Sequence, residues 1–248
     1  MTATGQLAWW GATDRGRARE NNEDAWRVED AVHAAILADG MGGANCGEVG
    51  SALTVSGVVE YLRSPEEGLS MEDVAKEAIR AANRKVQAAA RERTECDGMG
   101  STVVLVLWRL PNVVVANVGD SRAYLLRKGE LTQLSYDQNF ANELRASLGF
   151  SEERVRTMPN RHVLTMAIGT FEHVLVRTHL MRLEPGDQVL LCSDGLHGPV
   201  NDETISRILG ESASLRDKVE RLIDCANLNG GPDNVTAVLL EYKEATNG

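Results

Sequence analysis

The alternation of apolar and polar positions predicts that the chain opens with β structure. Three short segments are apolar, alternating or both, and polar turns separate them: residues 7–13, 25–29 and 33–38. Apolar positions from Val74 onward recur at helical spacing, which predicts an amphipathic helix over residues 72–93. A shorter helix is expected over residues 48–62, because Ser64-Pro65 would end it.

The middle of the chain predicts a run of antiparallel strands. Tight turns join four apolar segments: residues 102–109, 113–118, 123–127 and 131–134. Parallel strands would need crossover connections of about a dozen residues or more, so a doubly wound parallel sheet is disfavoured. Residues 137–165 are polar and weakly periodic, which indicates a surface insertion with short helices. The pattern then predicts further strands and helices: strands at 174–180, 188–193 and 235–242, and helices at 203–209 and 215–226.

Composition and charge narrow the class of protein. The 248 residues, of which 43% are hydrophobic, are typical of a globular chain, and no linker or internal repeat divides it. Asp and Glu outnumber Lys and Arg by 36 to 26, so nucleic acid is not an expected partner. The longest apolar runs fall far short of the roughly 18 residues that a membrane span needs, and the first residues carry no secretory signal. We therefore expect a cytoplasmic protein without a membrane span.

The cysteines give no sign of a metal or disulfide framework. Cys46, Cys96, Cys192 and Cys225 are scattered, without a C-x-x-C pair or a nearby histidine. We expect all four to be reduced, mostly structural thiols.

Candidate chemistry begins with four aspartates that each stand at the end of an apolar strand: Asp39, Asp120, Asp194 and Asp233. A single Asp-Gly can be a plain turn, but four carboxylates gathered at one sheet end would be costly without a neutralising cation. Ligands that are only oxygens favour Mg²⁺ or Mn²⁺. Gly40 fits such a site because a residue without Cβ lets its carbonyl oxygen approach a metal beside Asp39.

A basic segment precedes an acidic pair near the N-terminus. Arg15, Arg17 and Arg19 come just before Glu23 and Asp24. An arginine fork suits phosphate oxygens, although a solvated turn with weak surface ion pairs explains the segment equally well.

Three other hydrolytic mechanisms lack their motifs. No cysteine begins a C-x5-R loop, the G-x-x-x-x-G-K-[ST] loop is missing, and G-x-S-x-G is absent. Attack by a metal-activated water remains.

Seven motifs then resemble, in order, those of the metal-dependent serine/threonine protein phosphatases of the PPM or type 2C class, in their compact bacterial form. They are RGRARENNED at 15–24, DGMGG at 39–43, GST at 100–102, VGDSR at 118–122, LTMAIG at 164–169, SDGL at 193–196 and GPDNVT at 231–236. The resemblance covers almost the whole chain. It implies an α+β fold, an αββα sandwich of two antiparallel sheets flanked by helices, as one domain over residues 1–248 with the 137–165 insertion, called the flap in this family.

The resemblance also implies roles for individual residues. Asp39 would bridge two Mn²⁺ or Mg²⁺ ions, Asp194 and Asp233 would complete the first, and Glu23 with the Gly40 carbonyl would hold the second. Asp120 would hold a third ion with Asp194. Arg19 would bind the phosphoryl group and Asp24 would hydrogen-bond metal-bound water. The implied partners are phosphorylated proteins and a cognate serine/threonine kinase, and the implied state is a monomer that serves signalling.

The sequence departs from the family pattern at three places. Met41 stands where many eukaryotic relatives have a histidine proposed as general acid, so the proton donor to the leaving alkoxide is open. The flap begins with Asp137-Gln138-Asn139-Phe140 where Asp-His-Ser is usual, and His162 stands where Asn is common. These flap positions border the substrate groove and leave substrate preference open. Two alternatives stand beside protein dephosphorylation: a metal-free binding module, which the complete carboxylate set disfavours, and a phosphatase of small metabolites such as nucleotides.

Overall fold

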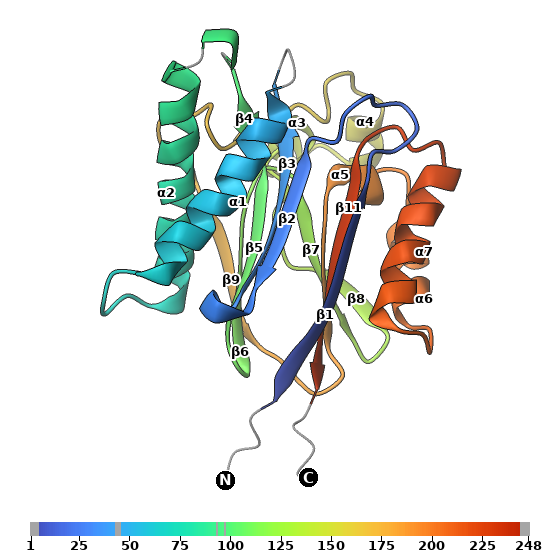
Figure 1. Cartoon of the computed structure of the whole chain (residues 1–248). Helices are drawn as coiled ribbons and strands as arrows, with labels where there is room; N and C mark the ends of the chain where they lie inside the picture. The colour runs from blue at the N-terminus through green and yellow to red at the C-terminus, as the bar shows by residue number, and fades with distance from the viewer. Residues whose placement is uncertain (1–4, 43–45, 93, 97, 244–248) are drawn as a thin grey trace.

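Two antiparallel β-sheets pack face to face in the computed structural model, and helices cover their outer faces (Figure 1). The structure describes residues 5–42, 46–92, 94–96 and 98–243. One sheet has the strand order β1 (Gln6–Asp14), β11 (Val235–Lys243), β10 (Gln188–Cys192), β7 (Arg122–Arg127) and β8 (Glu130–Gln133). The other has the order β2 (Asp24–Glu29), β3 (Ala34–Met41), β5 (Val103–Arg109), β6 (Asn112–Val118) and β9 (Arg177–Arg182), with β4 (Gly100–Ser101) paired to β3.

The helices form one layer on each side of the sandwich. Figure 1 shows α1 (Gly47–Arg63) and α2 (Met71–Glu92) beside the β3 sheet, and α6 (Asp202–Leu209) and α7 (Leu215–Leu228) beside the β11 sheet. The remaining helical segments are short: η1 (Asp30–Val32), η2 (Thr94–Cys96), α3 (Phe140–Leu148), α4 (Glu152–Arg156) and α5 (Asp194–His197). The predicted α+β sandwich is confirmed.

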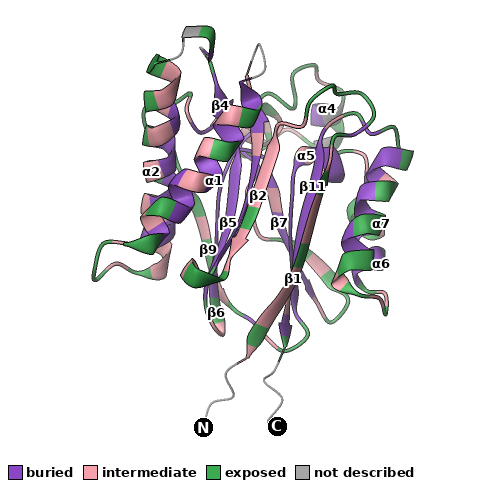
Figure 2. Ribbon diagram, viewed as in Figure 1, coloured by how far each residue is buried: buried purple, intermediate pink, exposed green. Residues whose placement is uncertain are grey.

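The central strands are apolar on both faces because each face is covered. In β3, Ile36 packs with the α1 and α2 side chains, whereas the next residue, Leu37, packs against the opposite sheet. In β10, Leu190 faces the α6 and α7 layer and Leu191 faces the other sheet. Figure 2 shows the same distribution, with buried residues in the strands and on the inner sides of the helices. Burial on both faces explains why these segments read as continuous apolar runs rather than as a strict alternation.

Most predicted elements lie within a few residues of their observed bounds. The predicted helices at 48–62 and 72–93 correspond to α1 and α2, and the flap contains α3 and α4. The strand predicted at 174–180 is displaced, because Val174 and Val176 are buried against the α1 and α2 layer before the ladder begins at Arg177. No helix in the described part of the chain is long and apolar enough to cross a bilayer.

One expectation about the cysteines is wrong. Cys46 and Cys96 form a disulfide, with their Cα atoms 5.5 Å apart, whereas Cys192 and Cys225 are free. The two bonded residues flank the α1 and α2 hairpin and are separated by 50 positions. Their spacing carried no signal because only the packing of the two helices brings them together.

The first and last strands run side by side along the whole sandwich. Gln6 pairs with Lys243 at one end, and Asp14 pairs with Val235 at the other. Asp233 precedes β11 at this second end. The start of β1 and the last residue of β11 therefore lie at the end of the sandwich opposite the aspartates (Figure 1).

Candidate active site

A pocket of about 280 Å³ lies at the end of the sandwich where several strands deliver acidic residues. Asp39 lies two residues before the end of β3, Asp120 follows β6, Asp194 follows β10 and Asp233 precedes β11. The pocket is lined by most of the residues that the resemblance singled out: Arg19, Glu23, Asp39, Gly40, Asp120, Asp194 and Asp233. The sequence therefore identified residues that the fold does bring together.

Asp24 lies beside this pocket and links the two sheets. It pairs with Asp39 across β2 and β3, and its Oδ2 accepts hydrogen bonds from Ser193 Oγ at 2.8 Å and Thr236 Oγ1 at 2.6 Å. Burial raises the pKa of Asp24 to about 7, although the two hydroxyl donors oppose that shift. The Asp24 carboxylate is thus fixed by side chains of the opposite sheet.

The electrostatics of the pocket are unfavourable for its own carboxylates. Burial raises the pKa of Asp39 well above its usual range, and repulsion from Asp24 and Asp194 raises it further. Burial also raises the pKa of Asp194, with repulsion from Asp233 as the next cause. Such shifts mean that ionised carboxylates at these positions need a compensating positive charge.

The residues fit a hard divalent cation. Asp24 Oδ1 and Asp194 Oδ1 are buried without a hydrogen-bond partner among the described residues. Clustered carboxylate oxygens are the donors that Mg²⁺ and Mn²⁺ prefer. In the described ranges, no group of three or more His, Cys, Asp or Glu side chains is arranged so that it could hold a metal ion by itself.

Glycines allow the backbone to pack closely around Glu23. A Cβ on Gly40 would lie 2.1 Å from the carbonyl oxygen of Gly47 and 2.5 Å from that of Glu23. A Cβ on Gly47 would lie 2.6 Å from the Glu23 carboxyl carbon. The start of α1 therefore touches Glu23, and Gly40 is required by this contact whether or not its carbonyl binds a metal.

The three N-terminal arginines differ in their contacts. Arg19 Nη2 donates to Asp233 Oδ2 at 2.7 Å, and its half-exposed side chain lines the pocket. Arg15 Nη1 instead donates to the Glu20 carbonyl oxygen at 3.2 Å. Neither Arg15 nor Arg17 lines the pocket, so the phosphate interpretation applies to Arg19 alone.

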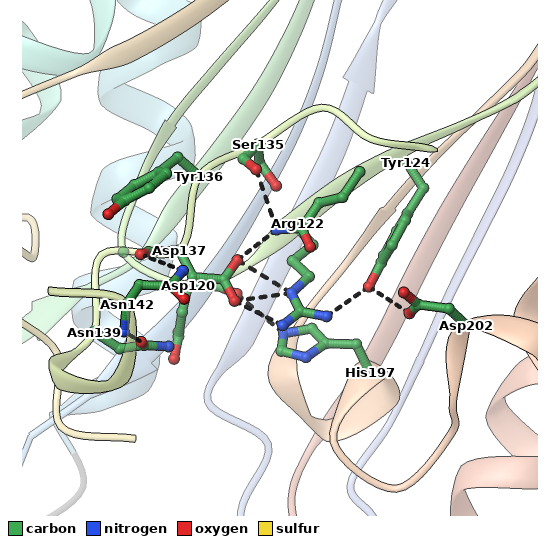
Figure 3. Close-up of polar contacts among 12 residues, drawn as sticks. Asp120, Arg122, Tyr124, Ser135, Tyr136, Asp137, Asn139, Asn142, His197 and Asp202 are labelled. Atoms are coloured by element: carbon green, nitrogen blue, oxygen red, sulfur yellow. Dashed lines mark hydrogen bonds and ion pairs between the residues drawn. The ribbon is translucent and has the colours of Figure 1, made fainter. Parts of the chain in front are cut away.

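Asp120 lies next to a buried polar network that reaches from β7 to the flap (Figure 3). Arg122 Nε donates to both carboxylate oxygens of Asp137 at 3.1 and 3.0 Å, and Nη2 donates to Oδ2 at 2.7 Å. Arg122 Nη1 also donates to the Tyr124 hydroxyl, which in turn donates to Asp202. The network attaches the first residue of the flap to the sheet.

His197 holds the backbone at Asp120. Burial lowers the pKa of His197 to about 3, so the ring is neutral and its Nε2–H donates to the Asp120 carbonyl oxygen at 3.0 Å. Burial raises the pKa of the Asp120 carboxyl to about 7, with repulsion from Asp194 as the next cause.

Several polar residues around the site were missed from the sequence. Asn234 accepts a hydrogen bond from the Glu23 N–H and donates to the carbonyl oxygens of Arg15 and Asn21, which fixes the arginine-rich loop. Thr102 Oγ1 accepts from the Asp39 N–H at 3.0 Å and lies 2.6 Å from Ser121 Oγ. Asn234 and Thr102 lie within motifs of the resemblance, but their partners are far apart in the chain.

The comparisons with known proteins agree with this geometry. The family model described as Protein phosphatase 2C matches residues 13–239. The serine/threonine phosphatase stp of Listeria welshimeri is 35% identical over 235 residues, which cover 92% of this chain and 93% of that relative. The serine/threonine protein phosphatase PstP of Mycobacterium tuberculosis is 36% identical, and the match covers 95% of this chain and 45% of the longer relative.

Solved structures show the same fold. The crystal structure of the Mycobacterium tuberculosis phosphatase PstP/Ppp superposes with a TM-score of 0.88 at 35% identity, covering 96% of this chain and 99% of that one. A PstP catalytic domain in complex with two manganese ions gives a TM-score of 0.84 at 34% identity, covering 96% and 99% of the two chains. The chain belongs to the protein phosphatase 2C family, the metal-dependent serine/threonine protein phosphatases.

Proposed function

We propose that this protein hydrolyses phosphoserine and phosphothreonine esters of proteins with Mn²⁺ or Mg²⁺ held by the acidic pocket. One observation carries the proposal: buried and half-buried carboxylates from both sheets line the same pocket as Arg19. A phosphoryl group is anionic, so this carboxylate set can accept it only together with cations.

Each acidic residue has a place in the proposed metal centre. Asp39 would lie between two ions, Asp194 and Asp233 would complete the first, and Glu23 with the Gly40 carbonyl would hold the second. Asp120 would hold a third ion with Asp194. Bound divalent cations lower the pKa of water and neutralise charge on phosphoryl oxygens.

The protein's own side chains then orient the reactants. Arg19 would bind phosphoryl oxygens, sharing its guanidinium with Asp233, to which it donates at 2.7 Å. Asp24 is held through Oδ2 by Ser193 and Thr236, so its Oδ1 is left to accept a hydrogen bond from the attacking water. Met41 lines the pocket, but a thioether cannot donate a proton to the leaving alkoxide.

The proposal extends to the chain as a whole. Residues 1–248 form one catalytic domain with a flap at 137–165, which acts as a monomer and opposes a serine/threonine kinase in cytoplasmic signalling. A reducing compartment would convert the Cys46–Cys96 disulfide to two thiols, so the oxidised pair does not itself support that location.

The decisive experiment compares two substrates in the presence of Mn²⁺ or Mg²⁺. Phosphate release from a phosphothreonine peptide should greatly exceed release from a nucleoside monophosphate, and excess chelator should abolish it. Preference for the nucleotide would favour the metabolite phosphatase instead. The Asp39→Asn variant serves as the control, because it removes the central charge and should lose hydrolysis while it keeps its fold by circular dichroism.

A further inference from the structure

A second pocket of about 280 Å³ opens beside the acidic pocket, between the flap and α5. The two pockets share Asp120, His162 and Asp194. Ala141 and the buried Val155 contribute small apolar surfaces to its wall. A substrate whose phosphate enters the acidic pocket therefore has the second pocket directly next to the phosphorylated residue.

Three arginines and three aspartates line this second pocket, but among the described residues only Arg122 and Asp137 form an ion pair with each other. Asp137 is neutralised by Arg122, and Asp120 and Asp194 belong to the proposed metal centre. Arg145 on α3 and Arg161 near the end of the flap also line the pocket, and both are exposed. Neither guanidinium has a hydrogen bond or ion pair within the described ranges. Two guanidinium groups that form no ion pair with a described residue thus face one pocket, in a chain with a formal net charge of −10.

We propose that this pocket is a substrate subsite in which Arg145 and Arg161 bind an anionic side chain close to the phosphorylated residue. The inference rests on the proposed function and names the class of substrate: phosphopeptides with a flanking carboxylate or a second phosphate. A guanidinium fork matches either anion. In an extended peptide, side chains two positions apart point to the same side and lie roughly 7 Å from each other, a spacing suited to two adjoining pockets.

Peptides of one length and one phosphothreonine test the subsite. Their flanking positions carry glutamate, a second phosphoserine, alanine or lysine, on the N-terminal or the C-terminal side. Ion pairs at exposed sites are individually weak, so we expect kcat/KM to be about three- to tenfold higher for the anionic peptides than for alanine, with lysine lowest. Comparison of kcat/KM for the glutamate and the phosphoserine peptides shows whether the subsite prefers a carboxylate or a second phosphate.

Charge variants connect the preference to the pocket. Arg145→Glu and Arg161→Glu should each reduce or reverse the preference for anionic peptides, chiefly through KM, and leave hydrolysis of p-nitrophenyl phosphate unchanged because that substrate has no flanking residue. Arg154→Glu is the matched control. Arg154 is also on the flap, but its guanidinium stacks on the Phe150 ring and it does not line the pocket.

Two results would overturn the inference. If the wild type had equal kcat/KM for all the peptides, the proposed subsite would be contradicted, whereas the proposed phosphatase function would still stand. An equal loss in Arg154→Glu and Arg145→Glu would show only a general effect of charge. If no phosphopeptide were hydrolysed, the proposed function would fail. The subsite would then be judged by fluorescence anisotropy with peptides that carry a non-hydrolysable phosphonate, among which the anionic ones must bind more tightly.

Discussion

Arg122 donates hydrogen bonds to both carboxylate oxygens of Asp137, at the end of β7 that borders the pockets. At the other end of the same strand, Arg127 makes an equivalent pair with Asp187, through Nε at 2.9 Å and Nη2 at 2.5 Å. Both aspartates are almost fully buried. One strand therefore carries two similar ion pairs, of which only one touches the site.

This symmetry allows a matched test of the flap attachment. Asp137→Asn leaves the largely buried Arg122 guanidinium without its ion pair and should lower the free energy of unfolding by about 3 kcal/mol. Asp187→Asn should lower it less, because the Arg127 side chain is more exposed and keeps its ion pair with Glu184. Only Asp137→Asn should also lower kcat/KM on phosphopeptides when assayed well below its Tm, because it loosens the flap beside Asp120. Equal activity in the two folded variants would mean that the Arg122 pair is purely structural.

Arg19→Ala should weaken the handling of the phosphoryl group. Arg19 is the one of the three N-terminal arginines that lines the acidic pocket. A hydrogen bond to a charged group contributes about 1.5 to 3 kcal/mol, so kcat/KM should fall ten- to a hundredfold. Steady-state assays of Arg15→Ala and Arg17→Ala provide the comparison. Similar losses in all three variants would favour a solvated turn over phosphate binding.

Removal of metal should make stability depend on pH in a definite direction. The pKa of Asp24 and that of Asp120 are raised to about 7, against about 3.9 in the unfolded chain. Between those values the folded state retains protons that the unfolded state has lost, so its stability falls as the pH rises from about 4 to 7. Chelated protein should therefore melt at a lower temperature at pH 8 than at pH 5.5, and Mn²⁺ should raise the Tm more at pH 8.

The matched variant for that measurement is Asp120→Asn, in which residue 120 cannot ionise, so the pH dependence of the Tm should become weaker while the contribution of Asp24 remains. A chelated wild type whose Tm does not change over this range would contradict the electrostatic account of the pocket.

Asp120→Ala should discriminate between leaving groups. An alkoxide leaves only when it receives a proton, whereas a phenolate with an electron-withdrawing group leaves unaided. If the ion proposed at Asp120 assists that proton transfer, the variant should slow hydrolysis of the phosphothreonine peptide sharply and spare p-nitrophenyl phosphate. Equal losses on both substrates would point to general damage to the metal centre.

The Cys46–Cys96 disulfide should be measurable in protein isolated without reductant. Thiol titration after denaturation should find two of the four cysteines free, and reduction should expose all four. A crosslink that closes a loop of this length typically contributes about 2–4 kcal/mol, so reductant should lower the Tm. Four titratable thiols before reduction would show that the pair does not form.

How far the sequence predicts the structure depends on whether a feature is local. Asp39 and Asp194 could be predicted as site residues because each follows an apolar strand within a recognisable motif. The hydrogen bond from Asn234 to the Arg15 carbonyl and the disulfide depend on segments 219 and 50 residues apart, and no local pattern encodes such pairs. The strand predicted over 174–180 begins before β9, because Val174 and Val176 lie two positions apart as in a strand but are buried against the α1 and α2 layer ahead of it.

The pairing of β1 with β11 determines where a surface or a fused protein can be attached without covering the acidic pocket. Gln6 and Lys243 lie next to each other, a full nine-residue strand from the acidic pocket, which corresponds to roughly 30 Å. A reporter, a bead or a second protein joined beyond either residue would stand behind the catalytic end rather than over it. Large phosphoprotein substrates could then still reach the acidic pocket of the tethered molecule.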